Sequence, residues 1–242
     1  KILIESDAFP SDRYAVESQL KFHGFDPKDA LVEWKPRKGE ELLRIEDLES
    51  ILEEIGDEIA LLLIGGVNYY TGQYLDIKQI AALGHAKKCK VGIDLAHGAG
   101  NIQPNLHESG VDFAAWCTYK YLNSGPGSLS GLFVHERHAY NKDLPRFAGW
   151  WNHNKSARFN MRQPFDVMNG AEGWQLSNPP ILSMAAIKAS LDMFDKIGMD
   201  SLREKSLKLT GYFEYLIHQI ETNRIKIITP KNPEERGCQL SI

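Results

Sequence analysis

Ile59-Ala60-Leu61-Leu62-Leu63-Ile64 is the longest apolar run in the chain, and Gly65-Gly66 follows it directly. A strand that is apolar at every position, and not only at alternate ones, is typical of a parallel sheet covered on both faces. The run is far shorter than the about 20 residues that a membrane-spanning helix needs. It therefore predicts a central strand of an α/β sheet.

Strand-like runs and helical patterns alternate on both sides of this run. Further strands are predicted at 2–4, 30–34, 91–95, 113–118 and 131–135. Apolar residues at helical spacing predict helices at 11–23, with Ser11 and Asp12 as its caps, at 45–55 and at 77–88. Such alternation predicts an α/β fold with a mainly parallel, doubly wound sheet.

The pattern changes in the second half of the chain. Residues 149–175 are irregular and aromatic-rich, and a loop of that length is usually functional or at an interface. Helices are predicted at 182–197 and, with Asp200 and Ser201 as caps, at 202–221. Strands at 225–228 and 238–242 would begin a small α+β domain. We therefore expect a large domain at 1–180 and a second unit at 181–242. Both ends look cut, so we interpret the chain as an internal fragment.

Composition narrows the class of protein. The 242 residues are 43% hydrophobic and 25% charged, and 28 basic against 32 acidic side chains give a net charge of −4. These values are typical of a globular protein and favour neither a nucleic-acid partner nor a membrane. The three cysteines, Cys89, Cys117 and Cys238, have no disulfide or metal spacing. We expect a reducing compartment and a cytoplasmic protein.

Lys120 is the residue most suggestive of chemistry. It follows a predicted buried strand, lies between Tyr119 and Tyr121, and precedes a glycine-rich turn. A lysine that loses solvation there has a lowered pKa, and its neutral amine can attack a carbonyl. The alternative is an ordinary surface lysine on a loop.

Asp94 ends the strand that precedes the strand of Lys120, so both residues should emerge at the same edge of the sheet. A carboxylate facing a lysine across a pocket is the arrangement that pyridoxal phosphate requires, because the carboxylate keeps the pyridine nitrogen protonated. The alternative is a helix N-cap. Together, the two residues favour the cofactor.

Other polar and aromatic residues are weaker candidates. His97 could stack on a ring or bond a carboxylate, or be an ordinary loop histidine. Phe9 could face a cofactor ring or lie in the core, and Asp12 could accept a hydrogen bond from a ring substituent. No metal site is predicted, because the histidines are scattered and His135 with His138 has no acidic partner at ligand spacing.

Four motifs in order resemble kynureninase, a family of fold-type I pyridoxal-phosphate hydrolases related to the class V aminotransferases. They are Phe9-Pro10-Ser11-Asp12, Val91-Gly92-Ile93-Asp94-Leu95-Ala96-His97, Trp116-Cys117-Thr118-Tyr119-Lys120-Tyr121-Leu122-Asn123 and Ser177-Asn178-Pro179-Pro180. The resemblance covers nearly the whole chain. The upstream phosphate-binding segment and the downstream carboxylate-binding arginine of the family have no match here.

The resemblance implies a role for each matched residue. Lys120 would hold the cofactor covalently, and Asp94 would pair with its ring nitrogen. Tyr119 would bind the phosphate and act as a proton donor. The remaining cofactor-binding residues would be Phe9, Ser11, Asp12, His97, Trp150 and Asn178, with the last two reaching the phosphate across a homodimer interface. Gly65 departs from relatives that carry a hydroxyl residue there.

The implied reaction is hydrolysis of L-kynurenine or 3-hydroxykynurenine to anthranilate or 3-hydroxyanthranilate and L-alanine, in tryptophan catabolism and NAD biosynthesis. Two alternatives remain. One is a cysteine desulfurase-like lyase of the same fold, which needs a reactive cysteine on a mobile loop. The other is a non-catalytic scaffold, against which the presence of both Lys120 and Asp94 argues.

Overall fold

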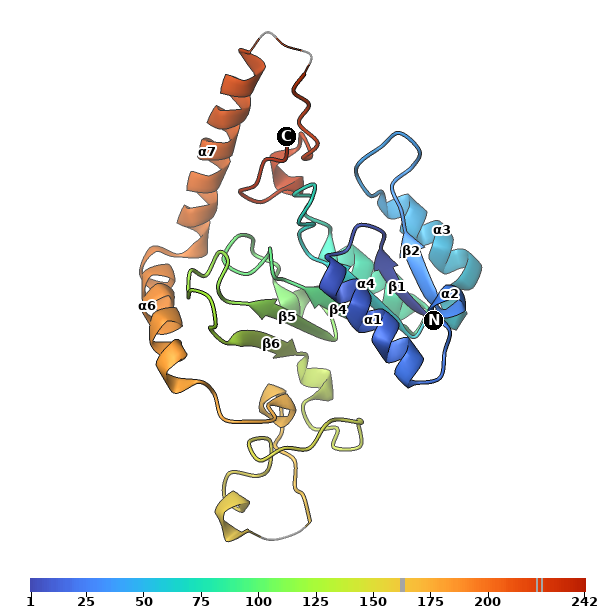
Figure 1. The fold of residues 1–242 in the computed structure, drawn as a ribbon, viewed down its shortest axis with the longest axis vertical. Coiled ribbons are helices and arrows are strands. Elements are labelled where there is room, and N and C mark those ends of the chain that lie inside the picture. The colour runs from blue at the N-terminus through green and yellow to red at the C-terminus, as the bar shows by residue number, and fades with distance from the viewer. Residues whose placement is uncertain (162–163, 221, 223) are drawn as a thin grey trace.

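A computed structural model describes residues 1–161, 164–220, 222 and 224–242. Its centre is one six-stranded sheet with the order β2-β1-β3-β4-β5-β6 (Figure 1). The strands are β1 (Ile2–Glu5), β2 (Leu31–Trp34), β3 (Leu61–Gly65), β4 (Lys90–Asp94), β5 (Phe113–Cys117) and β6 (Ser130–Val134). The first five are parallel, and β6 is antiparallel to β5. The predicted α/β fold with a mainly parallel sheet is confirmed.

Helices connect the parallel strands and continue beyond the sheet. The α-helices are α1 (Pro10–Phe22), α2 (Pro27–Ala30), α3 (Ile45–Ile55), α4 (Ile77–Ala86), α5 (Leu106–Ser109), α6 (Ile181–Ile197) and α7 (Met199–His218). Short 3₁₀ turns are η1 (Gly56–Glu58), η2 (Glu136–His138), η3 (Arg158–Asn160), η4 (Ala171–Trp174) and η5 (Pro233–Glu235). In Figure 1, α6 lies beside the edge of the sheet that ends in β6, and α7 extends from there away from the sheet. No helix of the described residues is both long and apolar enough to cross a membrane.

The core lies on both faces of the sheet. Ile4 packs with Val16 and Leu20 of α1 on one face. Leu3 belongs to the larger cluster on the other face, which includes residues of α3 and α4. Within β3, Leu62 and Ile64 join the larger cluster while Leu63 packs against the smaller one. Burial on both faces is the physical reason that this strand is apolar throughout.

The strand order reverses between β1 and β3. The chain passes from β1 outward to β2, returns to β3 on the other side of β1, and then proceeds through β4 to β5. In open α/β sheets the ligand site lies beyond the carboxyl ends of the strands at such a reversal. The topology therefore places a ligand site next to the ends of β1, β3 and β4.

Helix boundaries differ from the sequence prediction at two places. α1 begins at Pro10, so Ser11 and Asp12 lie in its first turn, and neither side chain caps it. Proline suits the first helical position because its φ angle is already helical. α7 begins at Met199 directly after Gly198, whose φ of 80° ends α6. Asp200 and Ser201 are therefore inside α7 and are not its caps.

The strands predicted at 225–228 and 238–242 are wrong. The two segments approach each other, but the backbone bond from Ile228 N to Ser241 O is accompanied by a side-chain bond from Ser241 N to Thr229 Oγ1 (2.7 Å) in place of a ladder. Two extended segments alone make a marginal sheet. A buried Arg236, paired with Glu214 of α7 at 2.6 Å, fixes the segment between them instead. The predicted division into 1–180 and 181–242 remains a prediction.

In its described residues, the segment 149–175 is irregular as predicted, and one asparagine organises it. Asn152 is fully buried, accepts a hydrogen bond from Gly149 N, and donates to the carbonyls of Phe147 and Gly173. These three bonds replace the regular backbone pairing that the segment lacks. A buried polar side chain with its partners satisfied in this way can hold a long loop in one conformation.

Candidate active site

A cavity of about 180 Å³ lies at the carboxyl edge of the sheet, beside the reversal of strand order. Residues that follow four different strands line it. They are Glu5, Phe9, Ser11, Asp12, Gly65, Val67, Asn68, Tyr69, Asp94, Ala96, His97, Cys117, Tyr119 and Lys120. Seven of the nine site residues predicted from the sequence are in this set. We call this cavity the edge pocket.

Asp94 reaches the edge pocket as the last residue of β4. Its Oδ1 accepts a hydrogen bond from Ala96 N at 2.7 Å, which fixes the carboxylate at the start of a turn. No helix begins there, because the next described helix is α5. The alternative reading of Asp94 as a helix cap is therefore wrong, and its side chain lines the edge pocket.

Lys120 is half-buried in the tight turn that follows β5. Asn123 N donates to the Lys120 carbonyl, and Ser124 donates from its backbone to Thr118 O and from its hydroxyl to Thr118 Oγ1. Asn123 has a φ of 55°, a left-handed conformation that asparagine tolerates. The turn directs the amine into the pocket, where Nζ lies 5.5 Å from the centroid of the Phe9 ring.

Aromatic side chains form one wall of the edge pocket. Phe9 meets Tyr69 edge-on with ring centroids 5.3 Å apart, and Tyr69 in turn lies 6.4 Å from His97. Phe9 is 46% exposed, so the alternative of a core phenylalanine is wrong. An exposed ring at the mouth of a polar pocket can cover a flat ligand.

His97 is half-buried, and one of its ring nitrogens is unsatisfied. Its Nδ1 is inaccessible to solvent and has no hydrogen-bond partner among the described residues. Burial lowers the pKa of His97, and the positive charge of Lys120 lowers it further. The imidazole is therefore suited to act in its neutral form toward a bound ligand.

Two further acids share the pocket with Asp94. Burial raises the pKa of Asp12, and so do the charge of Asp94 and a hydrogen bond between the two side chains. Burial also raises the pKa of Glu5 to about 7. Acids with such raised values are common where a site holds or transfers protons.

Glu5 was not predicted as a site residue. It ends an apolar strand, the same kind of position that singled out Asp94, and that position was the signal available in the sequence. The sequence analysis did not identify it because Glu5 lies outside the four motifs and has no lysine predicted to face it.

Tyr119 lies at the rim of the edge pocket and is 51% exposed. A hydrogen bond with Cys117 raises its pKa above the ordinary value, and the charge of that residue acts in the same direction. Within this chain, the surroundings therefore make Tyr119 a weaker acid than a free tyrosine.

Trp150 and Asn178 do not line the edge pocket of the same chain. Trp150 is 40% exposed and packs edge-on against Phe159, and Asn178 is exposed in the segment before α6. The structure thus does not join them to the other seven predicted residues.

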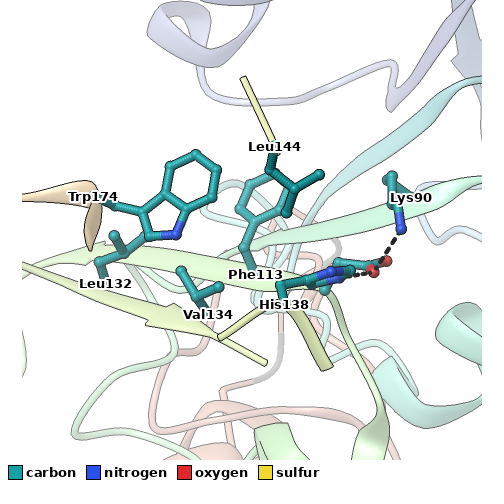
Figure 2. Close-up of a pocket in the computed structure, with 8 residues that line it drawn as sticks. Lys90, Phe113, Leu132, Val134, His138, Leu144 and Trp174 are labelled. Atoms are coloured by element: carbon teal, nitrogen blue, oxygen red, sulfur yellow. Dashed lines mark hydrogen bonds and ion pairs between the residues drawn. The ribbon is translucent and has the colours of Figure 1, made fainter. Parts of the chain in front are cut away.

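A second cavity, of about 360 Å³, lies at the opposite end of β4 and β5 (Figure 2). Phe113, Leu132, Val134, Leu144 and Trp174 make it largely apolar, and Lys90, Asp112 and His138 lie at its polar end. The Asp112 carboxylate accepts hydrogen bonds from Val91 N and pairs with His85, His138 and Lys90. Because these polar groups pair with one another, the lysine of this cavity is engaged in an ion pair, whereas Lys120 of the edge pocket has no ion-pair partner among the described residues.

No group of three or more metal-ligating side chains is arranged to hold an ion in the described parts of the chain. His138 has an acidic partner after all, because Asp112 lies 2.6 Å from its Nε2. The sequence missed this contact because the partner is 26 residues away.

The family profile described as "Aminotransferase class-V" matches residues 28–242. The chain belongs to the class-V aminotransferase family. This class-V chain is 57% identical over its whole length to a kynureninase of Myxococcus xanthus, and it spans 57% of the length of that relative. Other curated kynureninases are 50–57% identical to it.

Solved structures share the fold of this class-V chain at low identity. A C-DES variant, described with glycine covalently linked to its PLP cofactor, has a TM-score of 0.76 and 16% identity, with 96% of this chain and 58% of that structure covered. The cysteine desulfurase CsdA of Escherichia coli has a TM-score of 0.75 and 15% identity, with 95% and 53% covered. At these identities the likeness concerns the fold alone.

Proposed function

We propose that the edge pocket binds pyridoxal 5′-phosphate and that the protein hydrolyses L-kynurenine or 3-hydroxykynurenine. The products are anthranilate or 3-hydroxyanthranilate and L-alanine, which places the protein in tryptophan catabolism and NAD biosynthesis. The observation that carries the proposal is the meeting of Lys120 and Asp94 in one cavity at the reversal of strand order. The 57% identity to a kynureninase supports the substrate.

The residues of the edge pocket fit the cofactor. Lys120 supplies an amine, Asp94 a carboxylate, and Phe9 an exposed ring face. His97 Nδ1 is buried without a partner among the described residues, as expected for an atom that a ligand completes. Ser11 and Asp12 add polar groups at the same wall.

The bound cofactor supplies an electron sink for negative charge at the substrate Cα. Lys120 Nζ would hold the cofactor and then remove the Cα proton. Asp94 would keep the ring nitrogen protonated, and Asp12 would face the phenolic oxygen. His97 would orient the substrate carboxylate, and Phe9 would exclude water from one face of the ring.

Water adds to the γ-carbonyl of the substrate, and cleavage of the Cβ–Cγ bond releases the aromatic acid. The remaining three-carbon fragment would take up a proton at Cβ, regain at Cα the proton that Lys120 removed, and leave as alanine. Tyr119 is the proposed donor of that proton. Because its pKa is raised in this chain, a nearby positive charge would have to lower that pKa before Tyr119 donates readily.

A homodimer completes the phosphate site in this proposal. Trp150 and Asn178 are exposed and outside the edge pocket of their own chain, and an irregular segment carries Trp150. Both residues then bind the phosphate of the neighbouring subunit. The odd, unpaired cysteines fit a reducing compartment, and we place the protein in the cytoplasm.

The desulfurase-like alternative is less well supported. Cys89 is buried before β4, and Cys117 ends β5 in the wall of the pocket, so neither is on a mobile loop. Cys238 is exposed but lies in the segment fixed by Arg236. The scaffold alternative leaves unexplained why the amine, the acid and the unpartnered imidazole meet in one cavity.

The deciding experiment adds kynurenine to the full-length protein and follows anthranilate fluorescence. We expect fluorescence to rise only with the cofactor present, and a visible absorbance band that borohydride discharges. A protein that takes up the cofactor but releases no anthranilate would contradict the proposed reaction while leaving the cofactor site intact.

A further inference from the structure

Glu5 fills a gap in the sheet at the floor of the edge pocket. β1 and β3 pair at Ile2–Leu61 and Leu3–Leu62, and the pairing stops before Glu5. The Glu5 carboxyl then takes the place of the missing partner, since Gly65 N donates to its Oε1 at 3.0 Å and to its Oε2 at 3.1 Å. A Cβ at Gly65 would lie 2.6 Å from Glu5 Oε1, so glycine is what leaves room for this carboxyl.

Glu5 is nearly all buried, with 4% of its surface exposed. It lines both the edge pocket and a third, very small cavity. Trp34 of β2 is its uncharged neighbour in the sheet. The titratable and charged groups that face these two cavities with it are Asp7, Asp12, Glu41, Tyr69, Asp94, His97, Cys117, Tyr119 and Lys120. Acids therefore outnumber bases around Glu5.

The acids of this group affect one another. Burial is the main reason that the pKa of Glu5 is raised to about 7, with the charges of Asp94 and Asp7 acting in the same direction and the backbone hydrogen bonds acting against it. The charge of Glu5 is in turn one of the causes that raise the pKa of Asp12, after burial and Asp94. Ionisation of one acid therefore hinders ionisation of the others.

We propose that Glu5 is a positioning residue that fills the gap between β1 and β3 and, through its charge, sets how many protons the Asp12–Asp94 pair carries. The inference rests on the proposed function, because the pair faces a cofactor ring only if the cofactor binds there. A neutral Glu5 lets the pair ionise and attract a protonated ring nitrogen. A charged Glu5 favours retention of the proton that Asp12 and Asp94 share.

The test replaces Glu5 with glutamine in the full-length apoprotein. The amide oxygen of Glu5→Gln still accepts from Gly65 N, while the charge is lost. Pyridoxal phosphate is titrated into the apoprotein over a series of pH values, and its affinity is followed by protein fluorescence. We expect the pH at which affinity falls on the acid side to move down by about half a unit or more.

Two matched variants separate charge from packing. Glu5→Asp keeps the negative charge. We therefore expect the midpoint of its acid-side loss of affinity for pyridoxal phosphate to lie closer to that of the natural protein than the midpoint of Glu5→Gln does. Glu58→Gln removes an exposed acid paired with Lys1 at the far end of the sheet, and we expect no shift. Equal midpoints for Glu5→Gln and the natural protein would overturn the inference.

A second measurement covers the case in which Glu5→Gln does not fold. Carbon-13 NMR of glutamate-labelled natural apoprotein follows the titration of the Glu5 carboxyl directly. A titration near the ordinary value of about 4.3 would overturn the inference, and a clearly higher midpoint supports it. If the natural protein binds no pyridoxal phosphate at any pH, the proposed function is contradicted. The NMR titration of Glu5 can still be read in that case, because it needs no cofactor.

Discussion

Lys120 and Phe9 meet in space although their strands are not neighbours. Lys120 Nζ lies 5.5 Å from the centroid of the Phe9 ring, while β3 and β4 lie between β1 and β5 in the sheet. The contact is possible because the turn after β5 and the start of α1 line the same cavity as the ends of β3 and β4. Asp94 ends one of these central strands and so lines the same cavity.

Replacement of Lys120 by alanine tests this meeting point. We expect Lys120→Ala to lose the visible absorbance of the bound cofactor and to lower turnover on the order of 10³-fold or more, because no other amine lines the pocket among the described residues. Spectra and anthranilate release of the full-length variant are the measurements. Lys90→Ala, in the second cavity, is the matched control and should keep both signals. Unchanged colour and rate in Lys120→Ala would exclude the assigned role.

Asp94→Asn separates charge from geometry at the next strand. The amide oxygen can still accept from Ala96 N, so the turn should persist while the negative charge is lost. We expect partial retention of cofactor and a fall in turnover of about 100-fold or more, as for loss of a group that controls a proton. Asp76→Asn, where the side chain caps α4 by a similar bond to Gln79 N, is the control. Natural turnover in Asp94→Asn would restrict Asp94 to a structural role.

Tyr119→Phe tests the proposed proton donor. Without the hydroxyl, we expect turnover to fall by about 100-fold while the cofactor is still bound through Lys120. The comparison is steady-state kcat and cofactor content, with Tyr121→Phe as the control on the other side of Lys120. A variant that loses cofactor content and turnover together would show that Tyr119 serves binding and does not donate the proton.

The sequence allowed the sheet and most of the pocket to be predicted because both depend on local patterns. An apolar run such as that of β3 identifies a buried strand, and a polar residue directly after such a strand must emerge at the edge of the sheet. Asp94 and Lys120 are both of this kind, so their meeting followed from topology alone.

The features that were predicted wrongly or missed have a different cause, because they depend on contacts between segments that are distant in the sequence. Strands at 225–228 and 238–242 had the right residue types, but a strand forms only where a partner continues the ladder, and Arg236 holds this segment differently. The role of Glu5 depends on where the pairing of β1 and β3 stops, which no local pattern records. Asp112 gains its partners from α4 and from η2 after β6.

Asp112 should make the protein sensitive to acid. Burial alone would raise its pKa, but hydrogen bonds from His85, Val91 N and His138 lower it to about 2, from 3.8. An acid with a lowered pKa in the folded state stabilises the fold above its unfolded value, and this stability is lost as pH falls. We expect about 2 kcal/mol to be lost between pH 4 and pH 2 through this group.

Urea unfolding of the full-length protein at a series of acid pH values measures this loss. In Asp112→Asn the free energy of unfolding should be lower near neutral pH and should fall less steeply below pH 4. Asp57→Asn, an exposed acid before β3, is the comparison variant. Parallel curves for Asp112→Asn and the natural protein would show that the histidine pairs do not contribute.

The last prediction concerns the two residues that remain outside the pocket. Trp150 is 40% exposed and Asn178 is exposed, so in a monomer neither could reach a phosphate beside Lys120 without a rearrangement of the irregular segment. We expect light scattering of the full-length protein to give a symmetric homodimer, with each subunit lending Trp150 to the other. Coexpression of Lys120→Ala with Trp150→Ala tests the exchange: in mixed dimers one pocket has the lysine of one subunit and the tryptophan of the other. Random pairing should then restore about a quarter of natural turnover, because half of the dimers are mixed and each has one intact pocket. If Trp150 served its own chain, no mixed dimer would have an intact pocket, and turnover would stay at the level of the single variants.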